Sequence, residues 1–325
     1  MANSPKDIDT PSHRWQCQAM GTPPSRQGAI RIGFAGWSYP DWNGVFYPKP
    51  RPRGFQELAY IAQFFSVVEI NSSFYRPPRA EWAKKWIGQV ERHPDFHFTA
   101  KLWQGFTHER NATAEDERVF RQGFSPLAAE HRLGALLLQF PWSFKNTPDD
   151  RAYLANLIQR FGDYPLVVEV RHASWNEAEI FAWLREQHVG MCGIDQPLIG
   201  KSLRPAAQAT SAIGYVRLHG RNVERWFAKN ANASERYDYL YSAGELLPWV
   251  KRIEEIAQKT AIVYVIANNH PDAKAVVNAF QLENLISGKA VQPPAILIEH
   301  YPHLAEITSP PVFDRGERTG RLFPE

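Results

Sequence analysis

Two stretches of the sequence, SVVEIN at 66–71 and LVVEVR at 166–171, each place a carboxylate inside an apolar run. Short apolar runs rich in valine and isoleucine are typical of buried strands, whose side chains point alternately to the two faces. Val68 and Ile70 therefore share one face of the first stretch, and Glu69 points to the other. The carboxylate of the second stretch is placed in the same way. Because a buried charge is costly unless it is paired, both stretches predict a polar interior within an otherwise apolar sheet.

Strand-like runs and amphipathic helical patterns alternate around these stretches, which predicts parallel strands joined by crossover helices. Eight such runs match the roughly 250 residues of a (β/α)8 barrel of TIM type. An open, doubly wound α/β sheet is the alternative, but GFAGWSYPDW at 33–42 lacks the GxGxxG phosphate turn expected there. The predicted strands lie at 30–35, 67–71, 96–101, 135–139, 166–171, 190–195, 214–219 and 262–268. The predicted helices lie at 55–64, 79–90, 115–131, 148–161, 177–188, 244–259 and 272–285, and none is predicted between the sixth and seventh strands.

The barrel is expected to be a single domain at 29–287, flanked by two further segments. Residues 1–28 contain four prolines and no apolar period, which predicts a mobile N-terminal extension. Residues 288–325 carry one apolar run and then a polar tail, which predicts a C-terminal appendage packed on the barrel with Glu299 and His300 at the surface.

Composition narrows the setting and the partners. The 37 basic and 34 acidic residues give a net charge of only +3, so no duplex nucleic acid is expected as a partner. Cys17 and Cys192 fit neither a disulfide framework nor a zinc motif, which favours a reduced, cytoplasmic setting. No apolar run approaches the roughly 20 residues that span a bilayer, and the start lacks the apolar segment of a signal peptide, so no membrane association is expected. No oligomeric state is indicated.

Polar side chains recur on the inward face of the predicted strands. Lys101 lies on this face of the third strand, and Arg217 and His219 lie on it in the seventh. They come late in their strands and so near the C-terminal mouth, where barrel enzymes carry their active sites. Gln139 and Asp195 end the fourth and sixth strands at the same level. Six strands are therefore predicted to contribute polar residues to one pocket.

The alternative is a structural network of buried ion pairs, in which Glu169 pairs with Arg217 and Glu69 pairs with Lys101 or Arg171. Such pairs stabilise a fold weakly, because desolvation offsets the Coulomb attraction. Polar ends on six strands therefore favour a functional site over a purely structural network.

Tryptophans follow five of the predicted strands and are expected to surround the same mouth. An aromatic collar above charged groups suits a ligand with a flat or sugar-like face. The alternative is that these rings cap the barrel core, and four others on helical patterns are expected to be packing residues. The collar candidates are Trp37, Trp103, Trp142, Trp175 and Trp226, and the packing candidates are Trp82, Trp86, Trp183 and Trp249.

Several segments resemble the successive signatures of the YecE-like family, the domain of unknown function 72. They are GFAGWSYPDWNGVFYP, VEINSSFYRPP, FHFTAKLWQGFTH, LGALLLQFPWSF, VEVRHASW, YVRLHGR, YDYLYS and ANNHPDAKAVVNAFQL, in order from about residue 32 to residue 282. The resemblance implies a TIM-type barrel and assigns no reaction. This chain departs from the family pattern at His270, where an aspartate usually follows the two asparagines. The family-typical positions include Gly36, Trp37, Glu69, Asn71, Phe74, Tyr75, Lys101, Gln139, Glu169, Arg171, Trp175, Asp195, Arg217, His219, Gly220, Tyr237, Tyr239, Tyr241, Asn268 and Asn269.

The leading hypothesis is a metal-independent acid/base or hydrolytic enzyme acting on a small polar or anionic ligand that is sugar-like, phosphorylated or nucleotide-like. Glu69 or Glu169 would be the general base, while Lys101 and His219 would stabilise developing charge. The two carboxylates could flank a ligand as in glycosidases. No cofactor is expected. The expected ligand-binding residues are Trp37, Asn71, Tyr75, Gln139, Arg171, Trp175, Asp195, Arg217, Tyr237, Asn268 and Asn269.

Two other functions fit the same pocket. The first is a binding or sensor protein for a phosphorylated or single-stranded nucleic-acid ligand, which would use stacking and phosphate contacts. The second is a divalent-metal enzyme that uses Glu69, Glu169, Asp195 and His219 as ligands. Neighbouring lysine and arginine side chains weigh against the metal enzyme, because a metal ion and these cations repel one another.

Overall fold

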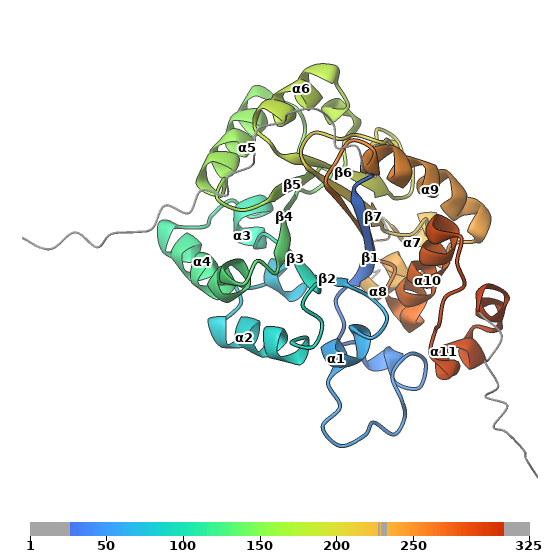
Figure 1. Cartoon of the computed structure of the whole chain (residues 1–325). Helices are drawn as coiled ribbons and strands as arrows, with labels where there is room; N and C mark the ends of the chain where they lie inside the picture. Colours follow the sequence, from blue (N-terminus) through green and yellow to red (C-terminus); the bar gives the residue numbers. More distant parts are fainter. Residues whose placement is uncertain (1–26, 227, 229–232, 309–325) are drawn as a thin grey trace, which may run out of the picture.

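The computed structural model describes residues 27–226, 228 and 233–308. Within them eight parallel strands close into a barrel in chain order, which confirms the (β/α)8 TIM-type prediction (Figure 1). The predicted N-terminal extension lies outside the described residues except for 27 and 28. The strands are β1 (Ala29–Ala35), β2 (Val67–Ile70), β3 (His97–Lys101), β4 (Leu133–Gln139), β5 (Leu166–Glu169), β6 (Gly190–Asp195), β7 (Ile213–Leu218) and β8 (Ile262–Ala267).

Closure of the barrel depends on β1, which pairs with β2 on one side and with β8 on the other. Gly33 lies opposite Val67 in one pairing and opposite Ile266 in the other. A Cβ atom at Gly33 would lie 2.0 Å from the Val67 carbonyl oxygen. A larger residue at this position would therefore push β1 and β2 apart.

Helices cover the outside of the barrel (Figure 1). All seven predicted helices occur with small shifts at their ends, and residues between β6 and β7 form none, as predicted. Three short helices lie in loops that follow β3 and β7, namely α3 (Gln104–Thr107), α7 (Val223–Trp226) and α8 (Ala233–Tyr237). The predicted helices are α1 (Glu57–Ile61), α2 (Ala80–Gln89), α4 (Ala114–Ala129), α5 (Pro148–Arg160), α6 (Ala178–Glu186), α9 (Ala243–Ala257) and α10 (Lys274–Ser287).

The sequence specifies the start of the longer helices through capping residues. At α4, the Thr113 side chain accepts a hydrogen bond from the Asp116 backbone N–H, and the Asp116 carboxylate accepts one from the Thr113 backbone N–H. Ser242 and Glu245 form the same reciprocal pair at α9. Each pair satisfies two backbone groups that a helix start otherwise leaves unpaired.

The last described segment packs beside α10 (Figure 1). It consists of α11 (Ala295–His300) and the 3-10 helix η5 (Pro302–Ile307), which bury Leu297 and Leu304 completely. The Tyr301 hydroxyl donates to the Asp272 carbonyl oxygen at 2.7 Å. Glu299 and His300 are exposed, as the sequence predicts.

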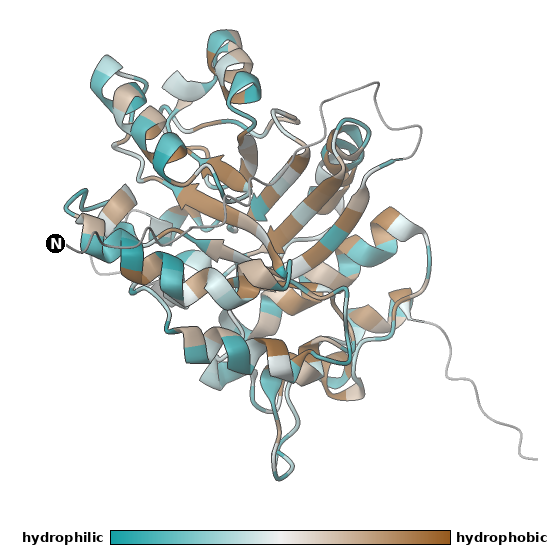
Figure 2. Cartoon of the chain, turned by 60° about the vertical axis from the view of Figure 1, so that its left-hand side comes forward, coloured by the Kyte–Doolittle hydropathy of each residue, from teal (hydrophilic) through white to brown (hydrophobic). Residues whose placement is uncertain are grey.

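Apolar residues concentrate along the strands and on the inner faces of the helices, while the outer helix faces are hydrophilic (Figure 2). This distribution makes the polar side chains inside the barrel exceptional. Among the described residues, no helix combines the length and the apolar character needed to cross a membrane.

Candidate active site

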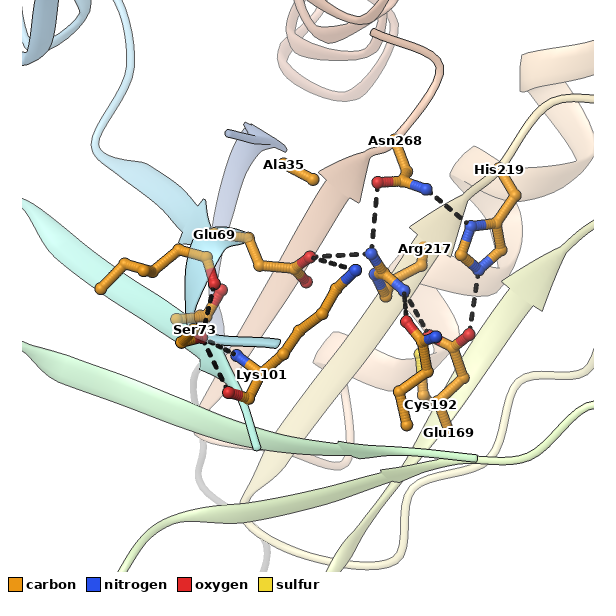
Figure 3. Close-up of polar contacts among 12 residues, drawn as sticks. Ala35, Glu69, Ser73, Lys101, Glu169, Cys192, Arg217, His219 and Asn268 are labelled. Atoms are coloured by element: carbon orange, nitrogen blue, oxygen red, sulfur yellow. Dashed lines mark hydrogen bonds and ion pairs between the residues drawn. The ribbon is translucent and has the colours of Figure 1, made fainter. Parts of the chain in front are cut away.

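Charged side chains from different strands meet inside the barrel near its C-terminal end (Figure 3). Glu69 comes from β2, Lys101 from β3, Glu169 from β5 and Arg217 from β7, while His219 follows β7 directly. The side chains of Glu69, Glu169, Arg217 and His219 are 0% exposed. The convergence predicted from strand alternation is therefore present for these five residues, which we term the buried cluster.

Arg217 joins the two carboxylates of the buried cluster. Its Nη2 donates to Glu69 Oε1 at 2.7 Å, and its Nη1 donates to Glu169 Oε2 at 2.7 Å. Nη1 also donates to Gln139 Oε1 at 2.9 Å, while Arg171 Nη2 donates to Glu169 Oε1 at 3.0 Å. The predicted pairing of Glu169 with Arg217 is thus present, and Arg171 pairs with Glu169 rather than with Glu69.

These contacts keep Glu169 ionised. Burial alone would raise the pKa of its carboxyl group, but the charge of Arg217, the hydrogen bond from His219 and the charge of Arg171 outweigh burial and hold that pKa well below its usual range. The pKa of Arg217 is raised, because the attraction of Glu69 and Glu169 exceeds the effect of burial. The two groups therefore stay charged at neutral pH.

His219 is held neutral in one tautomer by its neighbours. Arg217 Nη2 donates to Asn268 Oδ1 at 3.3 Å, which leaves the Asn268 amide group to donate to His219 Nδ1 at 3.0 Å. The proton of the neutral imidazole must then lie on Nε2, which is 3.1 Å from Glu169 Oε1. Burial, reinforced by Arg171 and Arg217, lowers the pKa of His219 to about 3 despite the Glu169 charge.

A tyrosine completes the contacts of Glu69. The Tyr215 hydroxyl donates to Glu69 Oε2 at 2.9 Å and hydrogen-bonds Thr99 Oγ1 at 2.8 Å. With Oε1 bound to Arg217, both Glu69 oxygens have close partners. Tyr215 lies two residues before Arg217, so the alternation that identified Arg217 also marked this tyrosine as inward-facing.

Lys101 is held less closely than the other members of the buried cluster. Its Nζ lies 3.8 Å from Glu69 Oε1 and 5.5 Å from the centre of the Phe74 ring, and its side chain is 8% exposed. Ser73 anchors the backbone instead: its Oγ accepts from the Lys101 N–H at 3.2 Å and donates to the Lys101 carbonyl oxygen at 2.7 Å. Burial and the Arg217 charge lower the pKa of Lys101 to about 7, against the attraction of Glu69 and Glu169.

A cavity of about 470 Å³ lies at the mouth and shares residues with the network below it. This volume is in the range of sites for small molecules. Gln139 and Arg171 belong to both the cavity wall and the network around Arg217. The Arg171 side chain is 12% exposed, and its guanidinium lies 5.6 Å from the centre of the Trp226 ring. The wall is formed by Phe74, Tyr75, Gln104, His108, Gln139, Pro141, Trp142, Arg171, Gln196, Trp226, Ala228, Arg236 and Tyr237.

The electrostatic environment of this cavity suits an anion. Burial, together with the charges of Arg171 and Lys101, lowers the pKa of His108 to about 4. His108 is therefore a neutral imidazole beside two cationic side chains. Arg236 adds a further guanidinium, whose buried Nε has no hydrogen-bond partner in the described structure.

Asp195 does not join the buried cluster, contrary to prediction. Arg221 binds it through Nε at 2.8 Å and Nη2 at 2.7 Å, and Trp249 of α9 and Tyr241 also donate to its carboxylate. Trp249 lies in the helical layer, so Asp195 faces outward from β6. The run GMCGID has apolar residues in both registers, which is why its alternation does not reveal the direction.

Only part of the predicted aromatic collar borders the cavity. Trp142 and Trp226 do, with Tyr75 and Tyr237. Trp175 is buried, stacks on Phe144 with ring centres 5.0 Å apart and donates Nε1 to the Phe144 carbonyl oxygen. It is a core residue, which corrects the prediction that it binds the ligand.

Other predicted residues support the mouth without lining the cavity. Trp37 packs edge-on against Trp86, and Trp103 donates Nε1 to the Tyr75 carbonyl oxygen at 3.2 Å. Asn269 Nδ2 donates to the Tyr239 carbonyl oxygen and to Asn278 of α10, and so fastens the 239–241 segment to that helix. Trp37, Asn71 and Asn269 are thus not part of the cavity wall, and their contact with a ligand stays a prediction.

The sequence did not single out the polar residues Gln104, Gln196 and Arg236 of the cavity wall. Gln196 comes directly after β6 and Gln104 three residues after β3, and a place just past the end of a strand was a usable signal. Arg236 lies in α8, far along the loop after β7, and no pattern marked it.

The residues suggested as metal ligands are not arranged as a metal site. Glu69 and Glu169 are bridged by Arg217, and Asp195 faces the other side of its strand. Across the described parts of the chain, no group of three or more histidine, cysteine, aspartate or glutamate side chains has an arrangement that could hold a metal ion.

Comparisons with known proteins agree with this fold. The family model described as "Protein of unknown function DUF72" matches residues 31–298. The UPF0759 protein YunF of Bacillus subtilis is 28% identical over 79% of this chain and 94% of its own length, and the UPF0759 protein YecE of Escherichia coli K12 is 31% identical over 44% of this chain and 48% of its own. Two crystal structures of DUF72 family proteins have a similar fold. The protein from Thermotoga maritima is 31% identical with a TM-score of 0.68, and the match covers 80% of this chain and 99% of that chain. The protein from Enterococcus faecalis is 25% identical with a TM-score of 0.71, and the match covers 79% of this chain and 95% of that chain. The chain therefore belongs to the DUF72 family.

Proposed function

We propose that this protein is a metal-independent acid/base enzyme that acts on a small polar or anionic ligand in the mouth cavity, with Lys101 as the group that transfers the proton. The observation that carries the proposal is the state of Lys101. Its pKa is about 7, its side chain is 8% exposed, and its Nζ makes no hydrogen bond within the described residues. A general acid or base works best when its pKa is near the operating pH.

The remaining residues of the buried cluster take supporting roles in this proposal. Glu69 and Glu169 have all four oxygens bonded within the protein and are fully buried, so they act on the charge of Lys101 and Arg217 rather than on the ligand directly. This arrangement disfavours a glycosidase-type reaction, in which two carboxylates face the ligand. His219 supports Glu169 by donating from Nε2.

Arg171 is the residue proposed to bind the negative charge of the ligand. It lies in the cavity wall and is held by Glu169 from below, which orients the guanidinium. Trp142, Trp226 and Tyr237 offer ring faces to the rest of the ligand.

The experiment is a turnover screen of sugar phosphates, sugar acids and nucleoside monophosphates, followed by ¹H and ³¹P NMR with EDTA present. The purified wild-type chain is compared with Lys101→Met and with Lys145→Met, a matched control at an exposed lysine. Turnover is expected with the wild type and the control, and loss of about 10²–10⁴-fold with Lys101→Met. Activity should rise as the pH passes about 7, because the neutral amine is the base.

Two results would overturn the proposal. Equal turnover by Lys101→Met would remove Lys101 from the chemistry. Tight binding of a screened compound that stays chemically unchanged would favour the sensor function instead.

A further inference from the structure

The charges around Lys101 balance one another without it. Two carboxylates, Glu69 and Glu169, are paired with two guanidinium groups. Arg217 binds both carboxylates with N···O distances of 2.7 Å, and Arg171 binds Glu169 at 3.0 Å. Glu69 therefore has its close cationic partner without the lysine. A protonated Lys101 adds a positive charge that no carboxylate of this network balances. Its Nζ lies 3.8 Å from Glu69 Oε1, which is longer than a hydrogen bond.

The Lys101 amine lies beneath the mouth cavity, next to a residue of the cavity wall. The Ser73 contacts fix the Lys101 backbone at the end of β3, and the side chain extends from there toward Glu69 and Arg217 (Figure 3). Its Nζ lies near the ring of Phe74, which is itself part of the cavity wall. Desolvation and a neighbouring cation are the two conditions that activate a lysine amine toward carbonyl carbon.

We propose that Lys101 forms an imine with the carbonyl carbon of an aldehyde or ketone that also carries an anionic group, and that Arg171 binds this group. This inference rests on the proposed function and names its substrate class. The neutral amine is already a major form at neutral pH, because the Lys101 pKa is about 7.

The step balances without an oxidant or a cofactor. The Nζ lone pair forms a bond to the carbonyl carbon, and the carbonyl oxygen takes up a proton to give a carbinolamine. The hydroxyl group then takes up a second proton from solvent, the C–O bond breaks and water leaves, while the nitrogen lone pair forms the C=N bond and Nζ keeps its one remaining proton, which gives a protonated imine. The proton that the adding amine loses passes through solvent in the mouth cavity to the carbonyl oxygen, while Glu69, 3.8 Å from Nζ and still bound to Arg217, stabilises the positive charge that develops on the nitrogen. The protonated imine then draws electrons from a bond next to the former carbonyl carbon.

The test is reductive trapping on the full chain. The protein is incubated at about neutral pH with glyoxylate, pyruvate or glyceraldehyde 3-phosphate and sodium cyanoborohydride, and the adduct is located by intact mass and peptide mapping. One adduct per chain is expected at Lys101, formed more than about tenfold faster than at Lys145, an exposed lysine beside Trp142.

Two variants sharpen the test. Lys101→Arg keeps a cation and removes the nucleophile, so it should stay folded by circular dichroism and lose the fast adduct, whereas Lys145→Arg should keep it. Adducts spread over surface lysines with Lys101 unmodified would overturn the imine for this substrate class. Loss of turnover in Lys101→Met without any trapped adduct would leave the acid/base function standing and remove only the imine, whereas unchanged turnover would remove both.

Discussion

His219 has a protonation state that its neighbours determine almost completely. Asn268 fixes the tautomer, and burial lowers the pKa to about 3. We predict that ¹⁵N NMR of labelled protein finds the neutral Nε2–H tautomer of His219 across the range from about pH 5 to about pH 8, whereas a free histidine titrates near 6.5. The unfolded chain takes up this proton below about pH 6.5 and the folded chain does not, so His219 lowers stability as the pH falls through that value.

The same spectra can contradict this prediction. A His219 resonance that titrates between about pH 5 and about pH 8 would be incompatible with the hydrogen bonds from Asn268 and to Glu169.

The direction of each inward-facing side chain was predictable wherever apolar and polar residues alternate along a strand. Val68 and Ile70 frame Glu69, and this pattern alone gave the direction of the carboxylate. Asp195 could not be placed in this way, because its strand offers apolar residues in both registers. The prediction for Trp175 was limited for a different reason, because the conformation of a loop determines where a residue after a strand points.

Arg217 acts at the scale of elements, because its guanidinium links β7 to β2 and β5. We predict that Arg217→Met leaves both buried carboxylates without their main partner and costs about 3–5 kcal/mol of the free energy of unfolding, measured with urea. Arg118→Met, which removes an exposed i,i+3 ion pair on α4, is the control and should leave the free energy of unfolding nearly unchanged.

A triple variant tests whether uncompensated charge, and not the changed shape of the side chain, causes this loss of stability. Arg217→Met combined with Glu69→Gln and Glu169→Gln removes the uncompensated charges, so part of the lost stability should return. A triple variant that is no more stable than Arg217→Met would show that buried charge is not the cause.

The pairing of β1 with β2 gives a second prediction at this scale. Gly33→Ala should cost about 3 kcal/mol or prevent folding, because the new Cβ would lie 2.0 Å from the Val67 carbonyl oxygen. Gly88→Ala is the matched control in α2, where a new Cβ meets no atom within 4 Å, and it should add about 0.5–1 kcal/mol. Similar urea midpoints for Gly33→Ala and the wild type would contradict the described strand pairing.

Elements and their order were largely predictable from apolar periodicity, whereas the mouth was not. The cavity wall depends on loop segments such as α3 and α8, whose positions follow from contacts distant in sequence. Arg236 is the clearest case, since it reaches the cavity from a helix of five residues.

The free energy of unfolding of the whole molecule should depend on the protonation state of Lys101. Its pKa is about 7 in the folded chain and about 10.4 in an unfolded one, so the unfolded chain binds more protons between these values and stability rises with pH. From about pH 6 to about pH 8, urea unfolding of the wild type should gain about 1 kcal/mol relative to Lys101→Met. Parallel pH curves for the two proteins would contradict this.

Closure of the barrel brings together site residues that no single sequence motif contains. Glu69 and Glu169 lie one hundred residues apart in sequence, yet one guanidinium binds both. Sequence reasoning predicted that these side chains share an interior. It could not predict that Arg217 would satisfy them both and leave Lys101 as the loosely held cation beneath the mouth.

The most direct test of this account is the pKa of Lys101 itself. In the intact protein with ¹³Cε-labelled lysine, the Lys101 resonance can be assigned by its loss in Lys101→Arg. The account predicts a titration midpoint of about 7 for this resonance, well below the value of about 10.4 for lysine in an unfolded peptide. A Lys101 resonance that shows no titration below about pH 9 would mean a permanently charged ammonium group, and the proposed acid/base role would be wrong.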